Sequence, residues 1–242
     1  LAKQIGKQLF RFTKYTAKIW IEVVAGGENI DRQVASLQRP THIVVATPGR
    51  LLDMIKRDAL RLDSVRHLIL DEADEMLNMG FKKELSQIIE LTRQRRSTWL
   101  FSATIPDAIN LLIKDCMSTK AHRLKIDKKS VVNRDIAHRF AICKREDRTR
   151  FICSFLRRQR KDRGMIFCAT KATAIALGNE LIAEGFSIGV LQGDLDQKER
   201  DKVMRAFKKE RVQFLVASDV AARGIDVEGL SFVIHQELPL KT

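Results

Sequence analysis

Short apolar runs alternate with longer stretches of helical periodicity along the whole chain. Apolar runs such as 43–46, 68–70 and 98–101 end at polar corners, and stretches with apolar residues at every third or fourth position follow them. Uninterrupted apolar runs are typical of strands that are buried on both faces of a parallel sheet. The pattern therefore predicts an α/β protein in which strands lead into helices.

The same pattern repeats in both halves of the chain. In the first half we expect strands at 19–24, 43–46, 68–70, 98–101 and 121–126, and helices at 1–15, 51–58 and 81–92. In the second half we expect strands near 136–143, 165–168, 187–191, 213–217 and 231–234, and helices near 147–160, 171–184, 197–209 and 220–223. A polar, unpatterned stretch at 127–133 separates them. We therefore predict a first domain at 1–127, a linker at 128–134 and a second domain at 135–242.

Three carboxylates follow the apolar run 68–70 directly. Asp71, Glu72 and Asp74 occupy three of four consecutive positions. Burying an unpaired carboxylate costs several kcal/mol, so the cluster must reach solvent, a cation or a basic partner. In open parallel sheets ligands collect at the carboxyl ends of strands, where this cluster is expected. The alternative is that the acids only begin a helix, where they suit the helix dipole.

Other corners of the first half have the chemistry of a phosphate site. Gly26-Gly27 follows a predicted strand, and Thr47-Pro48-Gly49-Arg50 joins another strand to a helix. A capping Thr, an early Pro, a Gly and an Arg at the positive end of a helix suit an anion. Ser102 and Thr104 follow the strand 98–101 and can bridge to carboxylates. Each corner, taken alone, is also explained by a plain turn or a capped helix.

Three corners of the second half resemble these. Thr170-Lys171 follows a strand, the segment 192–200 opens a helix, and the segment 218–226 joins the next strand to a helix. Asp196 and Glu199 have the spacing of a capping box. Helix capping explains each of these corners as well as a binding site does.

The net charge and the cysteine pattern narrow the classes of partner, metal site and location that the protein can have. The 242 residues contain 44 Lys and Arg against 30 Asp and Glu, a net charge of +14, and both halves are basic, which favours a polyanionic partner. No apolar run is long enough to span a membrane. The sequence has four cysteines, Cys116, Cys143, Cys153 and Cys168, without C-x-x-C spacing. A zinc site or disulfide framework is therefore not expected. Reduced thiols indicate an intracellular, cytoplasmic protein.

Together these corners resemble the DEAD-box RNA helicases of helicase superfamily 2, in the family's order and approximate spacing. The matching segments are Leu1-Ala2-Lys3-Gln4, Gly26-Gly27, Thr47-Pro48-Gly49-Arg50, Asp71-Glu72-Ala73-Asp74, Ser102-Ala103-Thr104, 197–200 and 218–226. The resemblance implies two RecA-like parallel-sheet domains in tandem that close over ATP and Mg²⁺ and grip RNA. The implied activity is ATP-dependent unwinding of short RNA duplexes by a monomer.

The resemblance also implies roles for individual residues. Asp71 would hold Mg²⁺, through water because this ion dehydrates reluctantly, and Glu72 would orient and deprotonate the attacking water. Ser102 and Thr104 would link the acidic cluster to the domain interface, with Asp74 as their partner. From the second domain, Gly224 and Asp226 would contact the nucleotide, Asp226 at the ribose.

RNA would be held through its backbone, which makes binding sequence-tolerant and salt-dependent. The residues that the resemblance assigns to RNA are Gly27, Thr47, Gly49, Arg50, Thr170, Gly193, Gln197, Arg200 and Ser218. At position 218 the family usually has Thr, and the hydroxyl is retained.

Three family features are missing from this sequence. There is no G-x-x-x-x-G-K-[ST] phosphate loop and no adenine-reading segment ahead of it, and the chain ends at 242 before a His-Arg-Gly-Arg motif. The expectation is a helicase fragment, with the first domain truncated at its N-terminus and the second at its C-terminus, that barely hydrolyses ATP alone. The alternatives are a non-hydrolysing RNA-binding clamp or scaffold derived from a helicase and, disfavoured by the motif pairing, a DNA helicase or other translocase.

Overall fold

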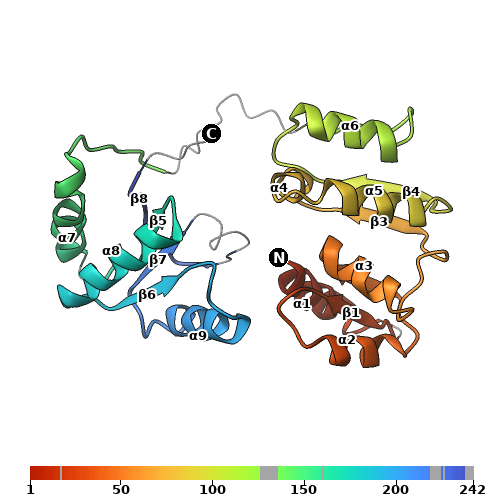
Figure 1. Ribbon diagram of the computed structural model, residues 1–242, viewed down its shortest axis with the longest axis horizontal. Helices are drawn as coiled ribbons and strands as arrows, with labels where there is room; N and C mark the ends of the chain where they lie inside the picture. Colours follow the sequence, from red (N-terminus) through yellow and green to blue (C-terminus); the bar gives the residue numbers. More distant parts are fainter. Residues whose placement is uncertain (17, 126–135, 160, 219–224, 226, 238–242) are drawn as a thin grey trace. The chain divides into compact units, whose positions relative to one another are not determined.

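The computed structural model describes residues 1–242 except 17, 126–135, 160, 219–224, 226 and 238–242. The chain divides into two compact units, unit 1 up to residue 131 and unit 2 from residue 132 (Figure 1). Both contain parallel strands joined through helices, so the predicted α/β fold class is confirmed. The predicted linker 128–134 lies outside the described residues.

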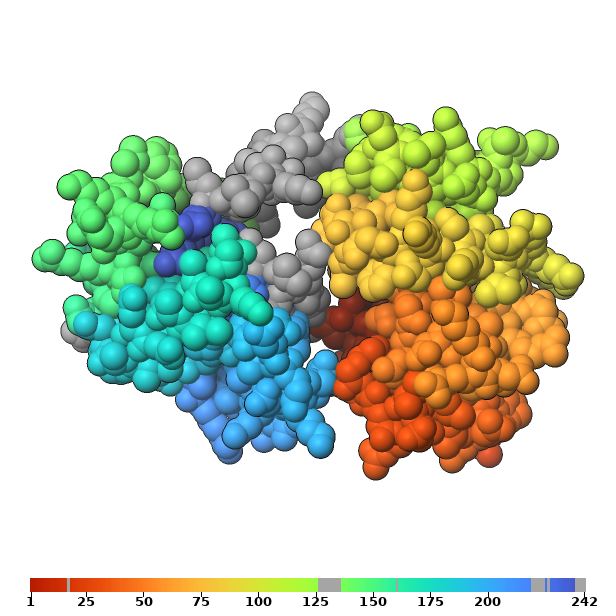
Figure 2. Space-filling model, in the orientation of Figure 1, coloured from red at the N-terminus to blue at the C-terminus, as the bar shows by residue number. Residues whose placement is uncertain are grey.

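Unit 1 contains two parallel strand pairs. Its elements are α1 (Ala2–Thr13), β1 (Ile21–Val24), α2 (Ile30–Leu37), β2 (Ile43–Ala46), α3 (Pro48–Lys56), β3 (His67–Leu70), α4 (Ala73–Asn78), α5 (Lys82–Leu91), β4 (Ser97–Leu100) and α6 (Asp107–Cys116). Strand β1 pairs with β2, and β3 pairs with β4. Figure 2 shows the unit as successive bands, from α2 and α3 in orange through α4 and α5 in yellow to α6 in yellow-green.

Strands β3 and β4 pack one face on the helices of unit 1. Leu70 joins Leu85 of α5 and Ile109 of α6 in a buried cluster. On the other face, Ile69 lies opposite Trp99, and these side chains are 61% and 57% exposed. The expectation that 68–70 is buried on both faces was therefore wrong, because in the described part of the chain helices cover only one face of this pair.

Unit 2 has one four-stranded parallel sheet in the order β6-β7-β5-β8. Its elements are a 3-10 turn η1 (Arg145–Asp147), α7 (Arg148–Arg158), β5 (Gly164–Cys168), α8 (Lys171–Ala183), β6 (Ile188–Leu191), α9 (Gln197–Lys208), β7 (Phe214–Ser218) and β8 (Phe232–His235). Ile166 packs with α7 and α8, whereas Met165 packs with Phe207 of α9. Successive side chains of a strand point to opposite faces, so helices bury both faces of the sheet.

Among its described residues, the structure lacks two of the predicted strands and contains a helix that was not predicted. The strands expected at 121–126 and 136–143 are irregular wherever they are described, and Leu124 and Ile142 are 95% and 94% exposed. A β-rich sequence forms a strand only where a neighbouring strand offers hydrogen bonds and side chains to pack against. Helix α2 was not predicted, and the helix expected at 220–223 lies outside the described residues.

Candidate functional site

The acidic cluster lies at the carboxyl end of β3, beside the end of β4. Pairing continues past both strands, since the amide of Phe101 donates to the carbonyl of Leu70 at 2.8 Å and the amide of Ala73 donates to that of Phe101 at 3.0 Å. Oδ1 of Asp71 accepts from the amide of Glu72 at 3.0 Å. These bonds bring the segments 71–74 and 101–104 together at one edge.

Glu72 adopts a left-handed backbone conformation. Its φ is 50° and its ψ is 47°, at the residue that precedes α4. This conformation costs a non-glycine residue roughly 1–3 kcal/mol, and such residues cluster at functional sites. The Glu72 side chain is exposed, while Asp71 is half-buried. The turn therefore presents the Glu72 carboxylate to solvent directly after a buried strand end.

Asp74 is the buried member of the cluster, at 5% exposure. Its Oδ2 accepts from the hydroxyl of Thr104 at 2.7 Å and from the amide of Thr104 at 2.9 Å. The hydroxyl of Ser102 accepts from the amide of Asp74 at 3.3 Å and donates to the carbonyl of Thr104 at 2.7 Å. The contact predicted between Asp74 and both hydroxyl residues is thus present.

Hydrogen bonding outweighs burial in setting the pKa of Asp74. Burial acts to raise the pKa of this carboxyl, but the bonds from the side chain and backbone of Thr104, helped by Ser102 and by the amide of Glu75, lower it below its ordinary value. Asp74 is therefore ionised at neutral pH. Its oxygens are committed to the segment 102–104, which makes it a structural link between the two strand ends.

The oxygen donors of this corner fit one mode of Mg²⁺ binding. No group of three or more His, Cys, Asp or Glu side chains that could enclose a metal exists among the described residues. Mg²⁺ is usually held by one or two carboxylates together with waters and substrate phosphates, and needs no protein cage. Asp71 is half-buried at a strand end and fits that arrangement.

The glycine turn after β1 is tied to the start of α3. The amide of Gly26 donates to Oγ1 of Thr47 at 3.4 Å, and the amide of Thr47 donates to the carbonyl of Val24 at 3.0 Å. Gly27 has a φ of 77°, a conformation that glycine adopts without a steric cost. The side chain of Thr47 makes no bond within its own helix. Its predicted capping role is therefore replaced by a link to the turn.

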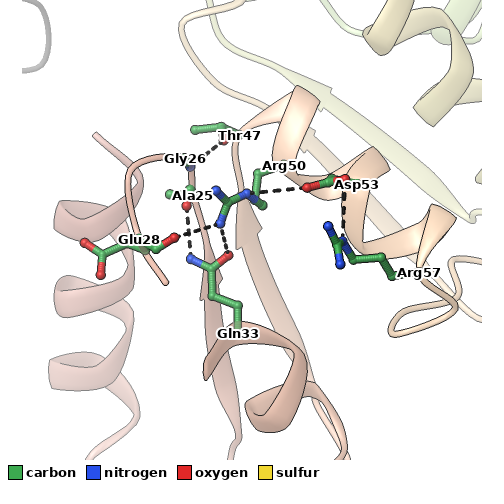
Figure 3. Close-up of polar contacts among 8 residues, drawn as sticks. All are labelled: Ala25, Gly26, Glu28, Gln33, Thr47, Arg50, Asp53 and Arg57. Carbon is green, nitrogen blue, oxygen red and sulfur yellow. Dashed lines mark hydrogen bonds and ion pairs between the residues drawn. The ribbon is translucent and has the colours of Figure 1, made fainter. Parts of the chain in front are cut away.

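Arg50 is held by a side chain that the sequence did not single out (Figure 3). Nη1 of Arg50 donates to Oε1 of Gln33 at 2.9 Å and to the carbonyl of Glu28 at 3.1 Å. Nε2 of Gln33 donates to the carbonyl of Ala25 at 3.0 Å, and Gln33 is buried. Gln33 therefore joins the glycine turn to Arg50.

The network fixes the guanidinium of Arg50 but does not use all of its donors. The Arg50 side chain is 17% exposed, and Nε lies 3.9 Å from Oδ2 of Asp53. Within the described part of the chain, Nη2 has no hydrogen-bond acceptor. A guanidinium has five N–H donors, so Nη2 retains two for an anion.

No backbone of the described residues lies close to Gly49. A Cβ built at Gly49 would meet the ring of Phe81 at 3.8 Å, an ordinary van der Waals distance. Pro48 occupies the first turn of α3, as predicted. No described segment of the protein uses the space beside Gly49 for a close backbone contact. A contact of Gly49 with a ligand stays a prediction.

The two corners of unit 2 that begin α8 and α9 lie at the carboxyl edge of its sheet and are held by local caps. Thr170 and Thr173 form a reciprocal capping box at the start of α8. Asp196 and Glu199 form another at the start of α9, as their spacing predicted. Nζ of Lys171 lies 2.9 Å from Oδ2 of Asp194, the residue after Gly193. This ion pair links the corner at Thr170 to the corner that begins α9.

The remaining predicted residues of unit 2 differ in accessibility. Nε2 of Gln197 donates to Oδ1 of Asp201 at 2.8 Å. Burial lowers the pKa of Arg200, which is half-buried on the same helix, against the opposing effect of Asp201. Ser218 is 4% exposed and pairs with Cys168 of the neighbouring strand β5, so little of it is accessible in this structure. Gly224 is also a predicted site residue; it and Asp226 lie outside the described residues.

Two family models cover most of the chain. The model described as "DEAD/DEAH box helicase" matches residues 1–112, and the "Helicase conserved C-terminal domain" model matches residues 147–242. Both units therefore match helicase domains, in the order that the sequence motifs predicted. In the described residues no helix has the length and apolar character needed to cross a membrane.

Named relatives agree with the family models. The chain is 39% identical over 239 residues to "DEAD-box ATP-dependent RNA helicase CshA" of Streptococcus pneumoniae, covering 99% of this chain and 45% of that protein. It is 37% identical over 241 residues to "ATP-dependent RNA helicase DbpA" of Bacillus subtilis, covering 100% and 50%. The chain thus spans about half the length of the curated relatives it matches.

The fold of the chain also resembles that of a solved structure. S. cerevisiae Dbp5 bound to RNA and ADP BeF3 matches with a TM-score of 0.86 and 28% identity, over 98% of this chain and 60% of that chain. The fold of the described units is therefore that of a known nucleotide-bound and RNA-bound protein.

Proposed function

The chain belongs to the DEAD-box helicase family, and from that premise we propose that it is the central part of an RNA-dependent ATPase that separates short RNA duplexes. The observation that carries the proposal is the corner at 71–74, where one carboxylate is buried in hydrogen bonds and two remain available beside it. Beside the buried Asp74, Glu72 combines a left-handed backbone with an exposed carboxylate.

The carboxylates divide the work of ATP hydrolysis. Asp71 would hold Mg²⁺, which when bound neutralises charge on the nucleotide phosphates. Glu72, presented by its left-handed backbone, would orient the attacking water and accept its proton. Asp74 holds Ser102 and Thr104 against the cluster, so the state of this corner is transmitted to the segment after β4. Phosphoryl transfer depends mainly on such positioning and charge stabilisation.

RNA binding would use the corners at the carboxyl ends of the strands. In unit 1, the glycine turn, Thr47 and Arg50 form one connected anion-binding corner. In unit 2, Thr170, Gly193 and Arg200 lie at the corresponding edge of the sheet. Backbone amides, hydroxyls and guanidinium groups suit phosphates and 2′-hydroxyls, so we expect sequence-tolerant, salt-dependent binding.

We also propose a reducing, cytoplasmic location. Cys116, Cys153 and Cys168 are buried free thiols. Burial raises the pKa of Cys116 and of Cys153, so their thiols stay protonated and unreactive at neutral pH.

The test of the proposed hydrolysis is Glu72→Gln in the protein that carries this chain. The substitution keeps size and hydrogen bonding but cannot accept a proton, so RNA-stimulated ATP turnover should fall by about 10²-fold or more while nucleotide affinity stays nearly unchanged. Turnover is measured by phosphate release and affinity by fluorescent-nucleotide titration. Glu84→Gln, a half-buried carboxylate on α5 away from the acidic cluster, is the matched control. Retained turnover in Glu72→Gln would refute the role of Glu72 and favour a non-hydrolysing RNA clamp.

A further inference from the structure

The first 21 residues have a charge unlike that of the rest of the chain. Leu1 to Ile21 contains five Lys and Arg, no Asp or Glu, and four aromatic residues. The cations and aromatics are interleaved along α1 and the segment that follows it. A stretch with this composition has no internal carboxylate that could neutralise it.

Helix α1 packs one side against unit 1 and presents most of these side chains on its other, exposed side. Its Ile5, Gly6 and Leu9 face unit 1, and a Cβ at Gly6 would collide with the side chain of Val23 in β1. This close approach fixes which side of the helix faces the sheet. Residues spaced by three and four positions share a helix face, so Lys7, Arg11 and Lys14 form one stripe on the outer side.

Aromatic rings flank the cationic stripe and stand in solvent. Phe10, Phe12 and Tyr15 are 66%, 76% and 86% exposed. Nζ of Lys14 lies 5.1 Å from the ring centroid of Tyr15. Exposed aromatic rings gathered on one segment beside cations are the features of an interaction surface. We name the six residues Lys7, Phe10, Arg11, Phe12, Lys14 and Tyr15 the α1 surface.

The α1 surface begins next to the proposed RNA corner. Lys3, one turn before Lys7 on the same stripe, forms an ion pair with the side chain of Glu28. The carbonyl of Glu28 accepts from Arg50. A polyanion that reaches Arg50 can therefore continue along α1, which is about 18 Å long at 1.5 Å per residue.

We propose that the α1 surface binds single-stranded RNA that extends beyond the corner formed by Gly27, Thr47 and Arg50, an inference that rests on the proposed function. Cations that follow a phosphate backbone, together with rings on which bases stack, are the features of sequence-tolerant single-strand binding. An anionic membrane also attracts basic, aromatic segments. Continuity with Arg50 favours RNA, and the membrane is tested as the alternative.

The test compares a short and a long oligouridine in the protein that carries this chain. RNAs of about 6 and about 15 nucleotides are titrated by fluorescence anisotropy at several salt concentrations, because only the longer one can reach past a single binding corner. In Lys7→Ala/Arg11→Ala/Lys14→Ala the salt slope for the long RNA should fall by about 2, at about 0.7 per lost phosphate contact. Binding of the short RNA should not change.

A second variant separates stacking from charge. Phe12→Ser/Tyr15→Ser should weaken binding of the long RNA by about 30-fold or more without changing the salt slope. The matched control is Lys82→Ala/Lys83→Ala/Lys114→Ala, which removes the same charge from exposed positions of α5 and α6 and should leave both RNAs unaffected. Both α1 variants alter exposed side chains, so their unfolding curves should match that of the parent protein.

The outcomes distinguish this inference from the proposed function. If the parent protein binds neither RNA, the proposed function fails. If it binds both and the α1 variants bind the long RNA normally, the α1 surface is not an RNA site and the inference is overturned. It is also overturned if the same variants lose binding to phosphatidylserine vesicles while their binding of the long RNA is unchanged.

Discussion

The two units hold their polar corners in different ways. In unit 1, partners far apart in sequence are joined by buried or half-buried hydrogen bonds, as between Asp74 and Thr104 and between Gln33 and Arg50. In unit 2, capping boxes hold the two corners that begin α8 and α9 locally, and the link between these corners is the exposed ion pair of Lys171 with Asp194.

The sheets explain the difference. All five residues of β7 are buried, and β7 lies between β5 and β6, so the strand ends of unit 2 are positioned by the core. In unit 1 the strands form separate pairs, and Ile69 on β3 is exposed. Polar contacts between strand ends therefore carry more of the positioning in unit 1, and mutations there should have larger and longer-range effects.

The largest expected effect is at Asp74. Asp74→Asn replaces the ionised acceptor of two bonds from Thr104, and should lower the free energy of unfolding at neutral pH by about 2–3 kcal/mol. The pKa of Asp74 is lower in the folded state than its ordinary value of about 3.9 in the unfolded state. Ionised Asp74 therefore stabilises the folded protein at a pH above about 3.9, and this stability is lost as the pH falls through the folded-state pKa. Urea unfolding should therefore show the two proteins converging at acid pH.

The matched control in the first turn of α2 is Asp31→Asn, an exposed change that should alter the free energy of unfolding by about 0.5 kcal/mol or less. An Asp74→Asn protein as stable as its parent at pH 7 would contradict the proposed difference between the units.

A smaller effect is expected on RNA binding. Arg50→Ala and Arg200→Ala should each weaken RNA binding uniformly across sequences and flatten the salt slope by about 0.7–1, as the loss of one phosphate contact requires. Arg50→Ala should have the larger effect on affinity, because it also releases Gln33 and the glycine turn. Fluorescence anisotropy with several RNA sequences measures both. A sequence-selective loss would indicate base reading instead.

The smallest expected effect is the coupling between Lys171 and Asp194. Both side chains are about 60% exposed, so a double-mutant cycle of the alanine variants should give a coupling energy of about 0.2–1 kcal/mol that declines with salt. The same cycle for Gln33 and Arg50, scored by urea unfolding, should give about 1–2 kcal/mol, because Gln33 is buried. Equal coupling in both pairs would remove the distinction between the units.

Much of the fold follows from local sequence patterns. Apolar runs ending at polar corners predicted the strands of both units, and capping spacing predicted the pair Asp196 and Glu199. The contact of Asp74 with Ser102 and Thr104 was implied by the family resemblance, and the structure contains it. These features depend on short-range rules that act within one corner or between neighbouring strands.

Features that depend on tertiary partners were not predicted. Gln33 lies in a helix that the apolar pattern did not indicate. Its role in holding Arg50 follows from its hydrogen bonds to Ala25 and Arg50, which only the structure shows. The apolar residues at 121–125 and 136–143 suggested strands, but no strand of the described sheets pairs with them. Ser218 was assigned to RNA from its motif, and that motif gave no sign of how deeply the residue is buried.

The most direct test of the central claim is the steady-state ATPase rate of the protein that carries this chain, measured with and without single-stranded RNA. The account predicts slow hydrolysis without RNA and a clear increase with RNA that an equal concentration of single-stranded DNA does not produce, because 2′-hydroxyls contribute to binding. An ATPase rate that is the same with RNA, with DNA and with neither would contradict it.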